Sequence, residues 1–530
     1  MSKISIKKPR LRWLFGGIGF HNSEASMTAL MSDRFKNEVA LKTFREISPT
    51  YSRVFAGFAD WTKEAMDAFA DYYDETFRKA GTLIYMVPGR MPMMMADFDM
   101  QAYCEKVASN LKYLVNERNC TKIRYYCVTN ELSAGNTYAY LAEKLDVFKN
   151  LHECLYKTFR KYGLDIGLIA TDCSEEHNFH QIQWATENMD EITEMYCAHL
   201  YSTKYPPGDL NAYQYYIDAF SPLVRQAHSK EKRFLLGEYG ITSPTRFSKM
   251  PMRNDVSYSV DMPEMDSIYA ISLCEMAMAA INCGCFAAVM WTMFDYPDPF
   301  IRENGDTPEE KARYDAARFS GHGLDIRYNK NGLIKWCDEE NDYGSRASLY
   351  TMGYMAKLFK KGSRVLESHW EDSFIRCCGV TCPDGSVSIA IINWEDREKT
   401  VSVDLEHNSD KLMRKYEYIA DNICFNKFND LQDYSELVKT NNNEFTIVLP
   451  PKSIVFLTTD YVDRVPSEIT GVKHSKGKLV WNKCRDEEHS YYRVYRNGEQ
   501  IASTVAEYIL ADEKAEYNVY SVDKYGNCNI

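Results

Sequence analysis

The chain has 530 residues, which is too long for one simple module and predicts two or three domains. Hydrophobic residues make up 45% of it, charged residues 26% and aromatic residues 13%, a globular composition that excludes disordered, collagen-like and coiled-coil proteins. The formal net charge of -12 repels phosphate backbones and anionic bilayers, so we expect neither nucleic acid nor a membrane as a partner.

Cysteine content and the amino-terminal sequence bear on the compartment. The 16 cysteines are too dilute for a disulfide scaffold and contain no CxxC pair at zinc-ribbon spacing, so we expect mostly reduced core residues. The first residues, MSKISIKKPRLRW, lack the apolar stretch of a signal peptide, and no later stretch is long and apolar enough to span a bilayer. As given, the chain is predicted to be cytoplasmic. A secreted protein whose signal sequence was removed would look the same.

Eight apolar runs with helix-like segments between them fill the first three hundred residues. The runs end near Phe20, Phe55, Val87, Thr129, Thr171, Leu200, Glu238 and Trp291. The mean step of about 39 residues suits one strand, one helix and two loops. Because the runs are apolar throughout, they are typical of parallel strands that are covered on both faces. We predict an α/β fold with a (β/α)8 TIM barrel over residues 1–360. An open doubly wound sheet is the alternative, but no GxGxxG turn follows the first strand.

Helical periodicity between the runs supports the barrel. Met66, Phe69, Ala70, Tyr73 and Phe77 share one helix face after the second run, and Asp60 or Thr62 could cap that helix. A second helix is predicted after the third run, with Tyr103, Val107, Leu111 and Leu114 on one face.

The pattern changes after the eighth run. Residues 295–344 form a polar stretch that predicts an extended loop, and SLYTMGYMAKLFKK predicts a closing helix. Short alternating runs over 361–461 predict an all-β sandwich domain. Residues 466–530 predict a small third β-sandwich. Within it, YRVYRNGEQIA and YNVYSVDKYGN resemble the later strands of fibronectin type III modules. The segment is short for such a module and has room for one strand fewer than usual.

Two glutamates stand where a barrel of this class carries its chemistry. Glu131 follows the fourth apolar run and Glu238 ends the seventh, at the carboxyl ends of their strands. Such a pair can divide acid and nucleophile roles, with carboxyl groups about 5 Å apart for retention of configuration and about 6.5 to 9.5 Å apart for inversion. Either residue by itself could be an ordinary ion-paired side chain.

At these positions the sequence resembles the retaining glycoside hydrolases of clan A, whose barrels carry an Asn-Glu acid/base after strand four and a nucleophilic Glu after strand seven. The matching segments are CVTNELSAGN and LLGEYG. An Arg near the end of strand two, a His or aromatic residue on strand six and a Trp on strand eight are usual in that clan, and Arg53, His199, Tyr201 and Trp291 occupy those places here. The architecture is nearest to family 39, with families 30 and 51 also similar. Two positions depart from the usual pattern, because Leu132 follows the acid/base and Gly237 precedes the nucleophile.

The resemblance implies a glycoside hydrolase that cleaves β-linked glycosides by double displacement, without cofactor or metal. Glu238 would be the nucleophile, with its pKa lowered by Arg53 and Tyr201, and Glu131 the acid/base in a less polar niche. Asn130 would bind the sugar 2-hydroxyl. Long loops after strands seven and eight suggest exo action on oligosaccharides. A transglycosylase with the same residues and a noncatalytic carbohydrate-binding protein are the alternatives.

Further candidates have both a sugar-binding and a structural interpretation. Trp291 could stack on a pyranose or pack in the core, and His199 could contact sugar or be a satisfied core histidine. His21 and Asn22 could reach sugar hydroxyls or serve a turn. Similarly undecided are the Met91–Met95 stretch and Asp172, Asp295 and Asp298.

The sequence leaves the sugar and the oligomeric state open. A uronic acid would need a basic partner, for which Arg90, Lys204 and Arg246 are candidates. The EEHNFH segment with His177 and His180 lacks the HExxH pattern, so we predict no metal site.

Overall fold

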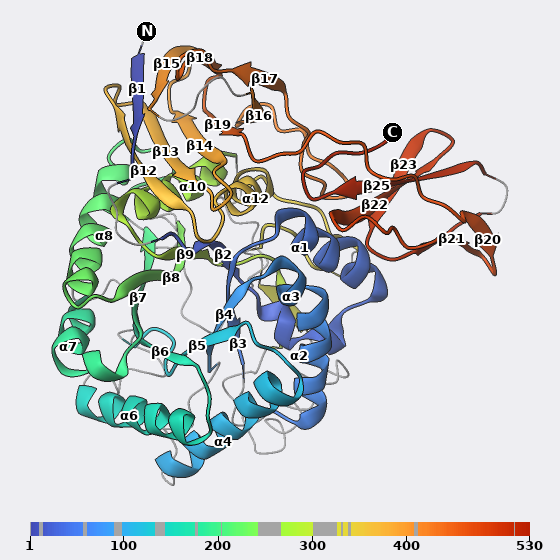
Figure 1. Ribbon diagram of the computed structural model, residues 1–530. Coiled ribbons are helices and arrows are strands. Elements are labelled where there is room, and N and C mark those ends of the chain that lie inside the picture. The colour runs from blue at the N-terminus through green and yellow to red at the C-terminus, as the bar shows by residue number, and fades with distance from the viewer. Residues whose placement is uncertain are drawn as a thin grey trace.

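The computed structural model describes residues 2–9, 14–56, 61–88, 98–132, 144–174, 179–202, 204–241, 267–299, 326–329, 332–337, 341–406, 412–512 and 515–530. All structural statements below concern these residues. Three units are visible in Figure 1: a barrel ringed by helices, a large β domain above it and a small β unit to one side. No described helix combines the length and the apolar character needed to cross a membrane.

Eight parallel strands close into the predicted barrel. In order around it they are β2 (Gly17–His21), β3 (Tyr51–Phe55), β4 (Leu83–Val87), β5 (Ile123–Cys127), β6 (Gly167–Cys173), β7 (Met195–Ser202), β8 (Arg233–Ile241) and β9 (Ala287–Met290). Strand β9 pairs in parallel with β2, which closes the ring. Each of the eight apolar runs in the sequence is one of these strands, because each is covered by side chains inside the barrel and by helices outside it.

Helices cover the outside of the barrel, as Figure 1 shows. They are α1 (Leu41–Ile47), α2 (Lys63–Glu75), α3 (Phe77–Ala80), α4 (Met100–Lys112), α6 (Leu145–Lys161), α7 (His180–Asn188), α8 (Ala212–Ser229), α10 (Ser267–Cys283) and α12 (Leu349–Leu358). The predicted apolar faces of α2 and α4 are buried, and the Thr62 hydroxyl caps α2 by accepting a hydrogen bond from the Ala65 amide at 3.2 Å. Asp60, the alternative cap, lies outside the described residues.

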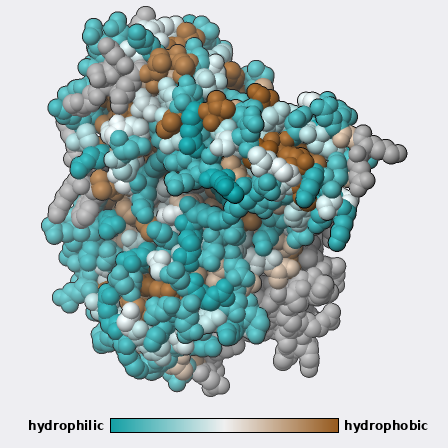
Figure 2. Space-filling view, turned by 45° about the vertical axis from the view of Figure 1, so that its right-hand side comes forward, coloured by the Kyte–Doolittle hydropathy of each residue, from teal (hydrophilic) through white to brown (hydrophobic). Residues whose placement is uncertain are grey.

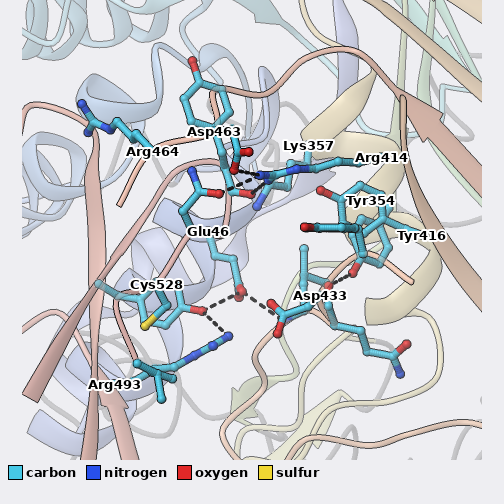
Figure 3. A pocket seen from close by; sticks show the side chains of 18 of the residues that line it. Glu46, Tyr354, Lys357, Arg414, Tyr416, Asp433, Asp463, Arg464, Arg493 and Cys528 are labelled. Atoms are coloured by element: carbon cyan, nitrogen blue, oxygen red, sulfur yellow. Dashed lines mark hydrogen bonds and ion pairs between the residues drawn. The ribbon is translucent and has the colours of Figure 1, made fainter. Parts of the chain in front are cut away.

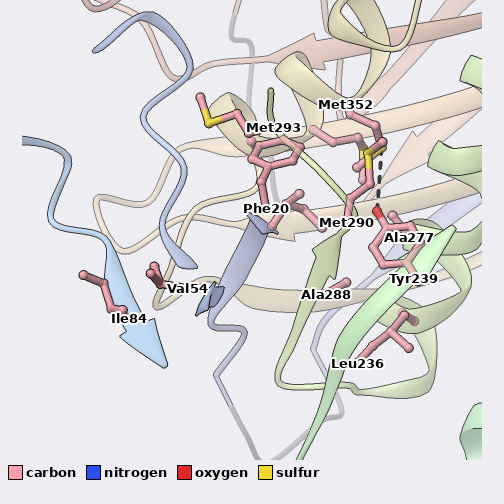
Figure 4. Close-up of a cluster of buried hydrophobic side chains, with 14 of the residues drawn as sticks. Phe20, Val54, Ile84, Leu236, Tyr239, Ala277, Ala288, Met290, Met293 and Met352 are labelled. Carbon is pink, nitrogen blue, oxygen red and sulfur yellow. Dashed lines mark hydrogen bonds between the residues drawn. The ribbon is translucent and has the colours of Figure 1, made fainter. Parts of the chain in front are cut away.

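Helices α10 and α12 are buried almost all round, because they lie between the barrel and the second domain. Figure 4 shows their side chains against the barrel strands, with the Tyr239 hydroxyl 3.7 Å from the Met352 sulfur. Because α12 contributes to this shared core, the sequence of the predicted closing helix is rich in apolar residues.

The second domain is a nine-stranded sheet whose order is β17-β16-β19-β14-β13-β12-β1-β15-β18. Its strands are β1 (Ser2–Lys7), β12 (Arg364–Trp370), β13 (Ile375–Thr381), β14 (Val387–Asn393), β15 (Lys399–Leu405), β16 (Leu412–Ile419), β17 (Glu436–Lys439), β18 (Glu444–Leu449) and β19 (Ser453–Thr458). One apolar core joins side chains of β1, β15 and β18 to those of β13, β14 and β19, so the sheet curls round its core as the two layers of a sandwich do.

The amino-terminal strand corrects the predicted domain boundaries. Strand β1 pairs antiparallel with β12 and parallel with β15, so residues at the start of the chain belong to the second domain rather than to the barrel assigned to 1–360. A short strand of alternating polarity gives no sign of a partner about 360 residues away. The remaining boundaries, at 361–461 and 466–530, stay predictions.

The third unit consists of two three-stranded sheets. One contains β20 (Lys473–Ser475), β21 (Lys478–Val480) and β24 (Tyr508–Leu510), and the other β22 (His489–Arg496), β23 (Glu499–Thr504) and β25 (Tyr517–Asp523). Leu479, Trp481, Tyr492 and Val494 lie in the core that both sheets share. This arrangement is compatible with a fibronectin type III-like module, which stays a prediction.

Part of the predicted loop over 295–344 is ordered as a ladder. Strand β10 (Tyr296–Pro299) pairs antiparallel with β11 (Ile326–Asn329), which the polar composition did not predict. The side chain of Asp298 and the segments 300–325 and 242–266 lie outside the described residues. The face of the molecule in Figure 2 is mostly hydrophilic, with hydrophobic side chains in small separate groups.

Candidate active site

Glu131 and Glu238 meet at the carboxyl ends of the barrel strands. A carboxylate oxygen of each and a ring nitrogen of His199 all lie within 4.8 Å of one another. The Glu238 side chain on β8 is 9% exposed, whereas that of Glu131, four residues after β5, is 23% exposed. Two residues 107 positions apart in the chain therefore face each other because their strands end on the same rim of the barrel.

Arg53 on β3 is the fully buried cation that ties the strands together. Its Nη1 atom donates to Glu238 Oε2 at 2.5 Å. Its Nη2 atom donates to Asn130 Oδ1 at 2.5 Å and to Asp172 Oδ2 at 2.8 Å. One guanidinium thus fixes the positions of three acceptors, one shortly after β5, one on β6 and one on β8, which a planar fork of donors can do.

His199 on β7 lies between three carboxylates. Its Nε2 atom is 2.9 Å from Asp172 Oδ1, in an ion pair rather than a well-aligned hydrogen bond. Its Nδ1 atom is 3.4 Å from Glu131 Oε1 and 3.8 Å from Glu238 Oε2. Burial opposes protonation, but the charges of Asp172 and Glu238 raise the pKa of His199 to about 9. His199 is therefore a cation at neutral pH.

The sequence leaves open whether Asp172 binds sugar or has a structural role. The structure places it between Arg53 and His199, at the centre of the network of charged side chains. It lies on β6, fully buried, and also accepts a hydrogen bond from the Cys197 sulfur at 2.9 Å. Burial alone would raise the pKa of Asp172, but the charges of His199 and Arg53 hold this pKa well below its ordinary value. The only sequence signal for this role is a carboxylate at a strand end, which many surface residues share.

The pKa values of the two glutamates differ from the sequence-based expectation. Tyr201 donates to Glu238 Oε1 at 2.5 Å, so both predicted donors of Glu238 are present. Burial nevertheless raises the pKa of Glu238, and the charges of Arg53 and His199 offset this only in part. Burial also acts on Glu131, but the hydrogen bond and charge of His199 outweigh it and lower the pKa of Glu131. The burial expected around Glu131 is present, but His199 faces this carboxyl and reverses the effect of burial on its pKa.

Trp291 follows β9 and is half-buried beside aromatic neighbours. Its ring centroid lies 4.3 Å from that of His21 and 5.7 Å from that of Phe55. Burial and the nearby charge of Arg53 hold the pKa of His21 well below its ordinary value, so this imidazole is neutral at pH 7. His21 is fully buried and bonds to the Ser23 hydroxyl at 2.7 Å, which makes it a support for the Trp291 ring.

Asn22 is a structural residue beneath the site. It is fully buried, donates from Nδ2 to Glu24 Oε1 at 2.8 Å and accepts from the Ser52 hydroxyl at 2.6 Å. The sugar-contact interpretation of Asn22 is therefore not favoured, and no capping bond to the short helix Ser23–Ser26 is present either. Glu24, which the sequence analysis missed, is buried, and its pKa is raised by that burial to about 8.

Steric crowding around position 237 explains why this residue is a glycine. A Cβ atom at this position would overlap the Cys197 sulfur and lie 2.7 Å from the Tyr85 hydroxyl oxygen. The same hydroxyl donates to the Gly237 carbonyl at 2.7 Å. The departure from the usual clan pattern at the position before Glu238 is thus matched by the residues on the neighbouring strands.

Other candidates lie elsewhere. Asp295 is buried in a two-point ion pair with Arg346, with both contacts at 2.8 Å, which makes it a loop support. Lys204 lies over the rings of Tyr205 and Tyr215. His180 begins α7. The candidates at Arg90, Met91–Met95, His177 and Arg246 fall outside the described residues.

Two groups of side chains have metal-like spacing among the described residues: Asp172, Cys197 and His199, and Glu131, His199 and Glu238. Both groups contain His199, which is protonated at neutral pH. Asp172 and Glu238 are already ion-paired with Arg53. A ligating imidazole must be neutral, so these side chains are better suited to exchanging protons and hydrogen bonds than to binding a metal cation.

Comparison with known proteins supports the fold. No protein-family model matches the chain, and no curated protein matches it in sequence. A glycoside hydrolase family 30 subfamily 8 xylanase from Clostridium acetobutylicum is 14% identical, with a TM-score of 0.54 over 86% of this chain and 99% of that chain. An alpha-L-arabinofuranosidase from Thermotoga maritima is 12% identical, with a TM-score of 0.58 over 87% and 100%.

A family 51 arabinofuranosidase from Xanthomonas axonopodis pv. citri is 14% identical, with a TM-score of 0.56 over 86% of this chain and all of that chain. Identities this low show a common fold only. The predicted clan A barrel with a companion β domain is confirmed at the level of fold: the chain has the architecture of these glycoside hydrolase barrels.

Proposed function

We propose that the chain is a retaining glycoside hydrolase that cleaves β-linked glycosides by double displacement. One observation carries this proposal: carboxylate oxygens of Glu131 and Glu238 lie within 4.8 Å of each other at the barrel rim. Retaining enzymes have carboxyl groups about 5 Å apart, whereas inverting enzymes leave room for a water molecule between groups about 6.5 to 9.5 Å apart. The shared fold with xylanase and arabinofuranosidase barrels agrees with this chemistry.

Glu238 is the proposed nucleophile. A Glu238 oxygen attacks the anomeric carbon while the bond from that carbon to the leaving oxygen breaks, which forms a glycosyl ester. Arg53 and Tyr201 hold the carboxylate at fixed positions, so the attacking oxygen is already oriented before the substrate arrives.

Glu131 is the proposed acid/base. It gives its proton to the leaving oxygen in the first step and takes one from water in the second. In the free protein the two carboxyls compete for a proton, and the lowered pKa of Glu131 puts it at a disadvantage. We infer that substrate shifts this balance, because covering the more exposed carboxylate with a sugar removes water from Glu131 and raises its pKa.

The remaining contacts agree with sugar binding. Asn130 is held by Arg53 beside Glu131, where its amide nitrogen could donate to a 2-hydroxyl. The half-buried Trp291 ring offers an apolar surface for the face of a pyranose. Exo action stays a prediction that rests on loops outside the described residues; release of internal fragments from a polymer would contradict it.

The test uses the intact chain and a panel of activated 2-fluoro glycosides. We expect one sugar of the panel to leave a covalent adduct, and peptide mass analysis to place it on Glu238. Proton NMR of the first product should show retained anomeric configuration. An adduct on a different residue, or an inverted product, would overturn the assignment. Products extended by a second sugar would instead identify transglycosylation by the same residues.

A further inference from the structure

A pocket that shares no residue with the barrel rim lies where all three units meet. Its volume is about 790 Å³. The walls come from α1 and α12 of the barrel region, from β16 of the second domain and from β22 of the third unit, as Figure 3 shows for Glu46, Lys357, Arg414 and Arg493. A pocket of this size is large enough for a small organic ligand.

The pocket has a buried floor and an exposed rim. Tyr354, Tyr416 and Tyr491 are at most 7% exposed and give the floor its aromatic surface. Tyr434 and Val465 are exposed at the rim. A ligand would therefore enter between polar and exposed side chains and reach buried tyrosine rings.

Two charged groups of the floor have their own partners. Glu46 is ion-paired with Lys42 at 2.7 Å and accepts hydrogen bonds from the Leu431 amide and the Tyr491 hydroxyl. Arg493 is ion-paired with Asp430 at 3.1 Å. These pairs neutralise each other inside the protein and leave no net charge for a ligand.

Arg414 and Lys357 are different. Arg414 is 2% exposed, donates to the Tyr525 carbonyl and the Asn527 side chain, and has a buried Nε atom without a hydrogen-bond partner. Its nearest carboxylate, Asp463 at 3.6 Å, has a side chain that is 87% exposed and therefore well screened by water.

Lys357 has no hydrogen bond or ion pair with any described residue, although it lines the pocket. Burial lowers the pKa of its ammonium, and the charges of Glu46 and Asp523 compensate this only in part. Figure 3 shows Lys357, Arg414 and Asp463 grouped on one side of the pocket. Two cations beside one exposed counter-charge give this side of the pocket a positive excess, while Asp433, a further carboxylate of the lining, lies near Glu46. A half-buried ammonium without a direct partner among the described residues favours an anion.

We propose that this pocket binds a small anion, whose carboxylate or phosphate group pairs with the Lys357 ammonium and whose body packs against the tyrosine rings of the floor. The proposal does not depend on the catalytic assignment, because the pocket shares no residue with the barrel rim. Since all three units contribute walls, a bound anion would also hold them together.

Calorimetric titration of the full chain tests the proposal. Sodium D-glucuronate, inorganic phosphate and D-glucose are titrated separately at constant ionic strength. We expect binding of at least one anion and none of D-glucose at this site. Binding of glucuronate alone identifies a carboxylate ligand, and binding of phosphate alone identifies a phosphorylated one. If neither anion binds in the millimolar range, the proposal is wrong.

Variants place the binding at the pocket. Lys357→Gln should weaken anion binding by about tenfold or more, as expected for loss of one charge-assisted hydrogen bond. Lys361→Gln removes the same charge from an exposed lysine four residues further on and should bind as the natural chain does. Lys357→Arg, which keeps the cation, should retain most of the affinity. Equal affinity in Lys357→Gln and the natural chain would overturn the assignment.

A direct readout does not depend on any variant. Crystals of the full chain soaked in tungstate, a tetrahedral anion with strong anomalous scattering, should show a peak beside Lys357. Anomalous peaks confined to other parts of the molecule would contradict the proposal.

Discussion

The Nε2 atom of His199 lies 2.9 Å from the Oδ1 atom of Asp172, and both side chains are fully buried. This pair orients the imidazole so that its other nitrogen faces the two glutamates at the rim. Asp172 does not need to touch substrate to affect the chemistry, because it sets the charge of His199 and, through it, the pKa values of Glu131 and Glu238.

Asp172→Asn should lose the stability that the protonated His199 contributes. The His199 pKa is raised from 6.5 to about 9, so this contribution is complete below pH 6.5 and disappears as the pH rises through 9. We expect the variant to have a lower free energy of unfolding than the natural chain. This difference should be about 3 kcal/mol larger at pH 6 than at pH 9.5, as measured by denaturant unfolding. The exposed Asp165→Asn is the control. The same stability difference at both pH values would contradict this coupling.

Loss of either catalytic candidate should nearly abolish activity on the glycoside identified by the panel. Glu238→Gln replaces the attacking carboxylate with a neutral amide, whose oxygen is a poor nucleophile, and we expect a fall of about a thousandfold or more in kcat. Glu131→Gln should instead keep the first step with a good leaving group, such as dinitrophenol, and accumulate the glycosyl ester. Added azide should then restore turnover and give a β-glycosyl azide, which NMR identifies. Unchanged turnover in either variant would exclude that residue from the mechanism.

Glu24→Gln should change how stability depends on pH. The pKa of buried Glu24 is raised from 4.5 to about 8, so the natural chain loses stability as the pH rises from 4.5 to 8. The full effect is roughly 5 kcal/mol, and glutamine cannot titrate. The melting temperature of the variant should therefore fall less between pH 5 and pH 8. Glu64→Gln, at an exposed position of α2, should keep the natural slope.

Gly237→Ala should destabilise the barrel at β8. The added Cβ would overlap the Cys197 sulfur and crowd the Tyr85 hydroxyl. Overpacking of this kind costs about 1 to 3 kcal/mol. The double variant Gly237→Ala with Cys197→Ala should recover part of the loss in unfolding free energy, because the shortest of the new contacts is removed. Additive losses would show that the overlap is not the cause.

Trp291→Ala should weaken substrate binding more than it slows chemistry. If the ring is a sugar-stacking surface, its removal raises KM by roughly tenfold and changes kcat less, because stacking acts in the ground state and the transition state alike. Trp184→Ala, on the outer helix α7, should leave both constants unchanged. A Trp291→Ala variant with unaltered KM would assign this ring to core packing instead.

The local parts of the fold could be predicted from the sequence. The eight barrel strands and the faces of α2 and α4 follow from runs and periodicities within about ten residues, and Thr62 caps its helix by a contact three residues away. Glu131 and Glu238 were identifiable because strand ends in a barrel share one rim, so their positions along the sequence carry information about their positions in space.

What only the tertiary structure decided depends on contacts between distant segments. Strand β1 pairs with β12 and β15, and the pocket around Lys357 is formed by three units. Asp172 differs from an ordinary strand-end carboxylate only because Arg53 and His199 arrive from other strands, and the pKa values of both glutamates follow from burial and from these charges. Electrostatic energies depend on distance and dielectric environment, and a sequence fixes neither until the chain is folded.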